Sequence, residues 1–158
     1  MADRIAVMSR GRIEQVSSPT EIYDRPQTLF VNEFVGSTNL LPGTLVSAPS
    51  GGTVVQLEAG ATLPVADGKS LPTGSSVVLS IRPEQLRIQA VPADGDLAAV
   101  VNAVMPLGAH VVYDVTVGPG TSLKVSEPRE ASAGMRAVGA TLYLRPASSG
   151  ACHVFPSP

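Results

Sequence analysis

Alternating apolar and polar positions recur along most of this chain, and the clearest example is VVLSIRPEQLRI at residues 77–88. Every second position from Val77 to Ile81 is apolar, which is the period of a strand with one buried face. Pro83 ends this strand, because it has no N–H to donate and fixes its own φ. Leu86 and Ile88 then resume the alternation, so the stretch predicts a strand, a turn and a second strand.

The same pattern returns farther along the chain. Ile81-Arg82-Pro83 is echoed by Leu144-Arg145-Pro146, and Gly60-Ala61-Thr62-Leu63 is echoed by Gly120-Thr121-Ser122-Leu123. Such self-similarity is typical of a duplicated unit, and residues 92–96 would then be the joint between the two copies. Chance is the alternative explanation, since valine-rich strands that end in proline are common.

Ten short strands are predicted after residue 42, separated by loops that contain glycine. This spacing indicates a mainly β fold, a small β-barrel or two barrel-like halves. The predicted strands are residues 43–47, 53–57, 62–65, 77–82, 86–88, 98–105, 111–117, 122–125, 141–145 and 153–155.

The first 36 residues follow a different pattern. Residues 1–17 read as a β-hairpin, which would be marginal alone and is expected to be disordered, exchanged between chains or paired onto another barrel. Ser18 and Glu21 predict a capping box with Pro19 at the first helical position. A second helix is predicted over residues 27–35, with Gly36 in a left-handed conformation at its end.

These patterns divide the chain into three parts. Residues 1–36 hold the hairpin and two short helices, residues 37–42 form a linker, and residues 43–158 form the β-domain. Hydrophobic residues make up 44% of the 158 residues but aromatic ones only 4%, so the core must be aliphatic.

Charge and cysteine content narrow the classes of function. The net charge is −2, which offers no basic field for nucleic acid. A single cysteine, Cys152, excludes a disulfide within the chain and fits a reducing compartment. The sequence contains neither an apolar run long enough for a membrane span nor an N-terminal secretion signal.

Motifs for chemistry are weak. Gly68-Lys69-Ser70 resembles the end of a phosphate loop, but Leu63 stands where that loop needs a glycine, so a surface turn is predicted. Cys152, His153 and His110 do not have zinc-site spacing, and no nucleophile-base motif is present, so neither a metal site nor a catalytic residue is predicted.

Two arginines are the best candidates for contacts with a ligand or partner. Arg82 and Arg145 each precede a proline at a predicted strand end. The structural interpretation is a guanidinium that holds a loop carbonyl or a carboxylate such as Glu84. The functional interpretation is contact with an anion or a partner, and the structural one is favoured.

The opening sequence, MADRIAVMSRGRIEQVSSPTEIYDRPQTLFVNEFVGSTNLLPG, closely resembles the end of the nucleotide-binding domain in ATP-binding subunits of bacterial ABC importers. The later Ile81-Arg82-Pro83-Glu84 resembles a signature of the TOBE domain, an OB-like regulatory β-barrel that follows the nucleotide-binding domain in one subfamily. The residues that carry the resemblance at the N-terminus are Asp3-Arg4-Ile5, Gly11-Arg12-Ile13, Gln15, Ser18-Pro19, Glu21-Ile22-Tyr23, Arg25-Pro26, Phe34-Val35-Gly36 and Asn39.

The resemblance implies an OB-like β-barrel built from two similar halves, with Gly36, Asn39 and Pro83 as structural positions of the family motif. The phosphate loop, signature loop and switch histidine of the family have no positions in this chain. The resemblance therefore implies a fragment without ATPase activity of its own and with no cofactor, whereas the parent subunit would use ATP and Mg²⁺.

The role implied by the resemblance is regulation and homodimerisation through the β-barrel. The parent subunit would contact membrane-spanning permease subunits at the cytoplasmic face of the cell membrane and import a solute, with polyamine or iron(III) favoured over sugar. A regulatory protein is a further partner in this family. Two alternatives stay open: a sensor that binds a small oxyanion in the barrel cleft, and an OB-fold that binds single-stranded nucleic acid.

Overall fold

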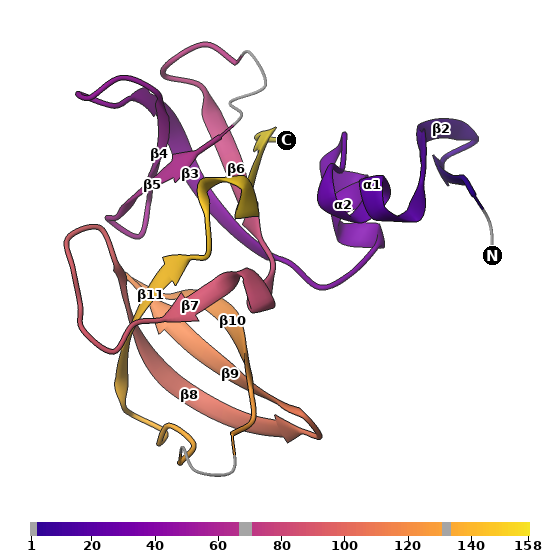
Figure 1. The fold of residues 1–158 in the computed structure, drawn as a ribbon. Helices are drawn as coiled ribbons and strands as arrows, with labels where there is room; N and C mark the ends of the chain where they lie inside the picture. The colour runs from indigo at the N-terminus through magenta and orange to yellow at the C-terminus, as the bar shows by residue number, and fades with distance from the viewer. Residues whose placement is uncertain (1–2, 67–70, 131–133) are drawn as a thin grey trace. The chain divides into compact units, whose positions relative to one another are not determined.

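The computed structural model describes residues 3–66, 71–130 and 134–158, which form two compact units (Figure 1). The first unit ends at Thr38 and the second begins at Asn39. Among the described residues, no helix has the length and apolar character that crossing a membrane requires. The two units are therefore considered one at a time.

The first unit is a β-hairpin that packs on two short helices. Ser18 caps the first helix as predicted: its Oγ accepts from Glu21 N–H (3.3 Å), and its own N–H donates to Glu21 Oε2 (3.3 Å). Thr28 caps the second helix by accepting from Val31 N–H. The elements are β1 (Ile5–Ser9), β2 (Arg12–Ser17), α1 (Pro19–Asp24) and α2 (Leu29–Phe34).

The hairpin packs on the helices of its own unit. Val7 joins Ile22 and Val31 in a small core. Gln15 bridges to the chain after α1, because its Nε2 donates to the Arg25 carbonyl (3.2 Å) and its Oε1 accepts from Gln27 N–H (2.9 Å). These contacts explain why the two strands hold together without a larger sheet.

The prediction that Gly36 ends the second helix in a left-handed conformation is wrong. The C-cap of α2 is Val35, whose φ of −89° and ψ of 1° are not left-handed, and Gly36 does not take a positive φ either. The helix is also shorter than predicted. Its first turn begins at Leu29 because Thr28 provides a better cap than the residues before it.

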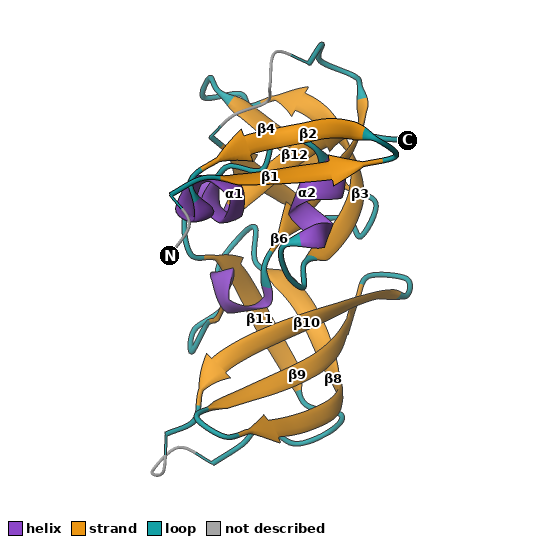
Figure 2. Ribbon diagram, turned by 90° about the vertical axis from the view of Figure 1, so that its right-hand side faces the viewer, coloured by secondary structure: helices purple, strands orange, loops and turns teal. Residues whose placement is uncertain are grey.

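The second unit is mainly β, as predicted (Figure 2), with two five-stranded antiparallel sheets. The first sheet has the order β12-β6-β3-β4-β5 and the second has the order β7-β11-β8-β9-β10. Each predicted strand after residue 42 is present. The strands are β3 (Asn39–Ser47), β4 (Thr53–Leu57), β5 (Thr62–Val65), β6 (Ser76–Ile81), β7 (Leu86–Ile88), β8 (Leu97–Leu107), β9 (His110–Val117), β10 (Thr121–Pro128), β11 (Thr141–Pro146) and β12 (Cys152–Pro156).

The chain folds twice through the same sequence of steps, and the two halves exchange their last strands. In the first half, residues 39–88, β3 to β5 form a meander, β6 pairs with β3, and the 3₁₀ turn η1 (Pro83–Gln85) leads to β7. In the second half, residues 97–156, β8 to β11 repeat these pairings, and η2 (Ser149–Ala151) leads to β12. However, β7 pairs with β11 of the second half, and β12 pairs with β6 of the first half.

The turns before β6 and β11 show how closely the halves correspond. Gly74 N–H donates to the Leu45 carbonyl (2.7 Å), and Gly139 N–H donates to the Val101 carbonyl (2.8 Å). Both glycines have a positive φ, 90° and 87°, which glycine adopts without strain. The predicted duplication is therefore confirmed in the fold.

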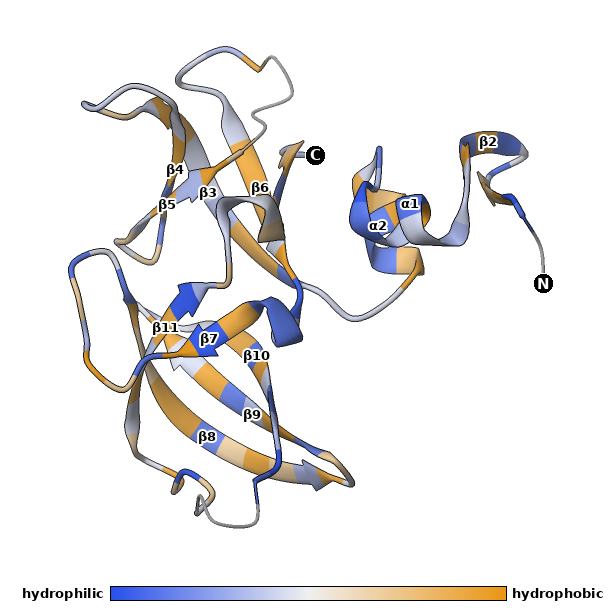
Figure 3. Ribbon diagram, viewed as in Figure 1, coloured by the Kyte–Doolittle hydropathy of each residue, from blue (hydrophilic) through white to orange (hydrophobic). Residues whose placement is uncertain are grey.

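One aliphatic core is shared by both sheets, as the hydrophobic bands on their strands indicate (Figure 3). Equivalent rows cross the first three strands of each half. Leu45, Val55 and Leu63 form one row, and Val101, Val115 and Leu123 form the other. The two hairpin tips also touch, since a Cβ added at Gly118 would lie 2.8 Å from Ala59 Cα.

The predicted linker at residues 37–42 is too long, because β3 begins at Asn39. In the structure Pro42 pairs with Val78 of β6, while pairing with β4 begins only at Gly43. The Pro42 carbonyl still accepts from Glu58 N–H (3.1 Å) just beyond β4, so Pro42 takes part in the sheet although it has no N–H to donate.

Candidate functional site

Arg145 lies at the end of β11 and forms a two-pronged ion pair with Asp96. Its Nε donates to Asp96 Oδ1 (2.6 Å) and its Nη2 donates to Asp96 Oδ2 (2.9 Å). The Asp96 side chain is 1% exposed and that of Arg145 is 45% exposed. The hydrogen bond from Arg145 is the main reason why the pKa of Asp96 lies below the ordinary value of 3.8.

This ion pair supports the structural interpretation of Arg145, in which the guanidinium holds a carboxylate. The carboxylate is that of Asp96, which the sequence analysis did not single out. Asp96 also accepts from Ala93 N–H (2.9 Å), so it fastens the loop before β8 to the end of β11. The sequence separation of 49 residues hid this contact.

A pocket of about 290 Å³ lies beside this ion pair. Its walls come from β5, from the loop before β8 and from the end of β11 with η2. Leu63, Pro64 and Pro146 give it apolar surface, while Asp94, Asp96, Arg145 and serine hydroxyls give it polar groups. The ionisable side chains of the lining are two carboxylates and one guanidinium, so together they carry a net negative charge.

In the first half, the Asn39 side chain fills the place that corresponds to this pocket. It stands six residues before Leu45, as Gly95 stands six residues before the equivalent Val101. Its Nδ2 donates to the Lys124 carbonyl (2.7 Å), and its Oδ1 accepts from Lys124 N–H (2.7 Å). The carboxamide thus occupies both backbone groups of the edge strand β10, and it is 6% exposed.

The pocket therefore marks the place where the two halves differ. Gly95 has no side chain to fill it, and Pro64 replaces Lys124 with a residue that has no N–H to donate. The two hydrogen bonds between the Asn39 carboxamide and the Lys124 backbone, here called the carboxamide clamp, thus have no counterpart at Gly95 and Pro64.

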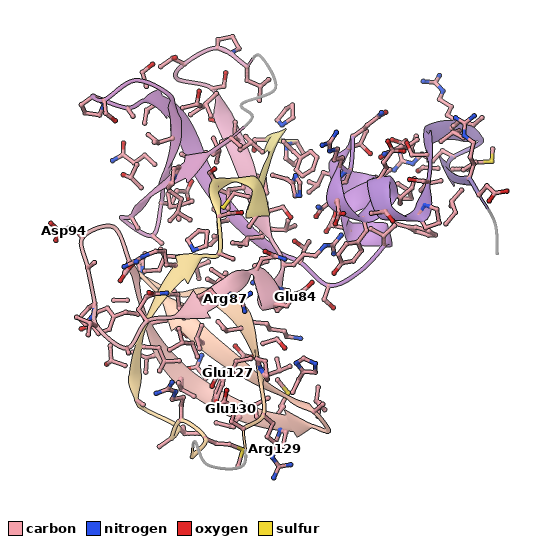
Figure 4. All side chains as sticks on the ribbon, viewed as in Figure 1. Glu84, Arg87, Asp94, Glu127, Arg129 and Glu130 are labelled. Atoms are coloured by element: carbon pink, nitrogen blue, oxygen red, sulfur yellow. The ribbon has the colours of Figure 1, made fainter. Side chains whose placement is uncertain are left out.

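Arg82 and Glu84 lie at the equivalent connection in the first half, between β6 and β7. Arg82 is buried, with 5% of its surface exposed, and Pro83 begins η1. Glu84 is exposed on η1, on the same segment as Arg87 of β7 (Figure 4). The structure places Arg87 opposite Arg145 across β7 and β11. Contact of Arg82, Glu84 or Arg145 with an anion or partner stays a prediction.

A second polar cluster, not predicted from the sequence, closes the far end of the second sheet beside a pocket of about 180 Å³. The buried Tyr113 hydroxyl donates to Glu127 Oε1 (3.1 Å) and accepts from Arg136 N–H (3.2 Å). Burial is the main cause that raises the pKa of Tyr113. Tyr113 follows the regular alternation of its strand, which gives no sign of a functional role. The one available signal in the sequence is an aromatic residue among aliphatic ones.

The residues weighed for metal or nucleophilic chemistry do not assemble into a site. Burial raises the pKa of Cys152 to about 12, which keeps its thiol protonated and unreactive. Among the described residues, no group of three or more His, Cys, Asp or Glu side chains is placed to hold a metal ion. Gly68-Lys69-Ser70 lies outside the described residues.

Comparisons with known proteins find one family model and several relatives that are similar to this chain. The model of the TOBE domain matches residues 79–155. A spermidine/putrescine import ATP-binding protein of Pseudomonas fluorescens is 38% identical over 128 residues, covering 81% of this chain and 34% of the relative. An Fe(3+) ions import ATP-binding protein of Rhizobium meliloti is 41% identical, covering 82% of this chain and 32% of the relative. The chain thus spans about a third of the length of these relatives.

A solved structure shares the fold. The cytoplasmic molybdate-binding protein ModG, crystallised with molybdate bound, superposes with a TM-score of 0.60 at 17% identity. The match covers 75% of this chain and 96% of that one. At this identity the likeness concerns the fold, and it confirms the predicted OB-like architecture.

Proposed function

Because this chain contains a TOBE domain and is similar to ATP-binding subunits of bacterial ABC importers, we propose that it is the regulatory and dimerisation region of such a subunit. The TOBE match carries this proposal, since it covers residues 79–155, from the end of β6 through β7 and the second half to β12. The TOBE domain is non-catalytic, so ATP and Mg²⁺ would be handled by other parts of the longer subunit.

Pairing of two such regions would act as a fixed pivot. Two barrels that clasp each other raise the effective concentration of the attached motor domains for one another. The shared aliphatic core supports this role, because a rigid body transmits position better than a flexible one. The parent subunit would bind permease subunits at the cytoplasmic face of the membrane.

We place the chain in solute import. The identity of the transported solute is the part of this proposal with the least support. The two named relatives import polyamines and iron(III), respectively. We favour these two classes of solute over sugars. A regulatory protein partner and the absence of nucleic-acid binding complete the proposal, the latter because the net charge is −2.

Light scattering and calorimetry test the proposal on the full 158-residue chain. We expect a homodimer at moderate concentration and no heat of binding when ATP and Mg²⁺ are added. A strict monomer at high concentration would remove the dimerisation part, and tight ATP binding would remove the non-catalytic part.

Sensing of a small oxyanion is the second candidate function. The ModG fold and the pocket beside Arg145 favour it. Against it, two of the donors of Arg145 already bind Asp96, and the pocket lining is net negative. Binding to the native state alone must raise the melting temperature, so thermal shifts with molybdate, sulfate, phosphate and polyamines decide. A shift with an oxyanion that the R145A variant loses would establish this site.

Nucleic-acid binding is a third class. It predicts a shift of single-stranded oligonucleotides in gels at low salt that weakens as salt rises. We expect no shift.

A further inference from the structure

The second half extends beyond the first at one end of its sheet. Tyr113 pairs with Val125 as Thr53 pairs with Val65 in the first half. Strand β4 begins at Thr53, but β9 begins three residues before Tyr113. Strand β5 ends at Val65, but β10 ends three residues after Val125. The first half forms an equivalent sheet without this extension, so the extension is not needed for the fold.

The pocket of about 180 Å³ lies at this extension and is here called the end pocket. Val111, Glu127 and Pro128 of its lining belong to the extension, and Tyr113 lies beside them. At about 30 Å³ per molecule, the volume of the end pocket corresponds to about six water molecules, so it suits a small metabolite. The remaining lining residues follow β10 in the chain, and they are Arg129, Glu130, Gly134, Met135 and Arg136.

The charged side chains of the end pocket are two carboxylates and two guanidiniums, so their charges sum to zero. They are those of Glu127, Glu130, Arg129 and Arg136. Figure 4 shows Glu127, Arg129 and Glu130 grouped at the end of β10. The Tyr113 hydroxyl adds no charge at neutral pH, because burial raises its pKa. A ligand with a single charge meets repulsion as well as attraction here, whereas a ligand that carries both charges matches each sign.

Both signs of charge in the end pocket keep hydrogen-bonding capacity. The Tyr113 hydroxyl fixes Glu127 by donating to its Oε1 (3.1 Å), and no hydrogen bond to Glu127 Oε2 is present among the described residues. Arg136 Nε lies 3.9 Å from the same Oε1, which is too long for a hydrogen bond. In the part of the chain that the structure describes, the side chains of Arg129 and Glu130 form neither a hydrogen bond nor an ion pair. A ligand can therefore bind these groups without displacing a hydrogen bond of the fold.

We propose that the end pocket binds a small zwitterion of the α-amino acid class. The carboxylate of the ligand accepts hydrogen bonds from the guanidiniums of Arg129 and Arg136. The ammonium group of the ligand donates to the carboxylates of Glu127 and Glu130. Val111 offers an apolar wall to the side chain of the ligand. The proposal does not rest on the role in import, since it concerns only the residues of this pocket.

Thermal shifts of the full chain test whether both charges of the ligand are needed. The probes are the free amino acids alanine, serine, valine and proline, each added to about 10 mM so that a millimolar site is nearly filled. The amide of each amino acid keeps only the positive charge, and the N-acetyl derivative keeps only the negative one. We expect at least one free amino acid to raise the melting temperature, and its two derivatives to have much smaller effects.

Substitutions locate the site. R129Q and E130Q each remove one charged partner of the ligand, so calorimetry should show binding weakened by about tenfold or more. The matched controls are R87Q and D94N, which remove exposed charges of the same sign elsewhere on the second unit (Figure 4). We expect both controls to bind the amino acid as tightly as the natural chain does.

Three results would overturn the proposal: no binding by any of the four amino acids, equal binding by a derivative with a single charge, and equal losses in the controls. If R129Q and E130Q fail to fold, amide chemical shifts of the natural chain decide in their place. Titration with the amino acid should then move the signals of Val111, Tyr113 and Glu127. Changes confined to other residues would place the ligand elsewhere and reject the end pocket.

Discussion

At the scale of single residues, Asn39 shows how one side chain joins the two halves. Its two hydrogen bonds of 2.7 Å satisfy both backbone groups of Lys124 on the edge strand β10. We expect N39A to lower the free energy of unfolding by about 2 kcal/mol, because two partly buried backbone groups of Lys124 lose their partner. Urea unfolding measures this loss. The matched control is N102A, whose 2.7 Å bond to Thr116 is exposed and should matter much less; equal losses would contradict the clamp.

Cys152 gives a second prediction at this scale. A pKa of about 12 in place of 9.0 lowers the thiolate fraction at pH 8 by about a thousandfold. We expect the native chain to react with a thiol reagent at least that much more slowly than the chain in urea. Rapid labelling of the native protein would show that β12 opens readily.

Asp96 predicts a dependence of stability on pH. Its pKa is lower in the folded state than its ordinary value of 3.8. Its contribution is therefore complete well above pH 3.8 and is lost as the pH falls through the folded pKa. We expect the melting temperature of D96N to lie below that of the natural chain at pH 7 and the difference to shrink toward pH 2. A constant difference would mean that ionisation of Asp96 contributes nothing.

At the scale of elements, the hairpin tips β4–β5 and β9–β10 form a tight contact. Gly118 has a φ of 55°, and an added Cβ would meet Ala59 backbone atoms at 2.8 and 2.9 Å. We expect G118A to cost about 1–3 kcal/mol from strain and the forced shift of the β4–β5 turn. In G60A the φ of 94° is also positive but the space is open, so it should cost less. Thermal unfolding compares the two variants.

The elements were the most predictable level of this structure. Strands β4, β5 and β7 have the predicted bounds, because their alternation and the glycine or proline nearby are purely local signals. The start of β3 was missed because Pro42 interrupts the local pattern, and its tolerance depends on where β4 begins to pair. The partners of Arg145 and Asn39 were missed because they lie 49 and 85 residues away.

At the scale of the whole molecule, the repeat predicted two similar halves but not their exchanged strands. Ile81-Arg82-Pro83 and Leu144-Arg145-Pro146 mark equivalent strand ends, yet either arrangement of β7 and β12 satisfies the same hydrophobic pattern. Only the pairing of β12 with β6 across the molecule decides between them.

Removal of β12 tests this arrangement. A chain that ends at Ala151 keeps every strand of the second sheet but removes β12, one of the two partners of β6, from the first. We expect amide hydrogen exchange to speed up in β6 and β3, distant in sequence, more than in the nearby β11. Loss of Pro158 alone serves as the control. Faster exchange in β11 than in β6 would contradict the strand order.

The exchanged last strands also set the order of events on the ribosome. Synthesis of the first half ends at Ile88, but β12, the fifth strand of the first sheet, is complete only at Pro156, 68 residues later. At about 5–20 residues per second, the nascent first half waits several seconds with the flank of β6 uncovered. During that interval the backbone groups of β6 that later pair with β12 stay open to other chains, which is a hazard for aggregation.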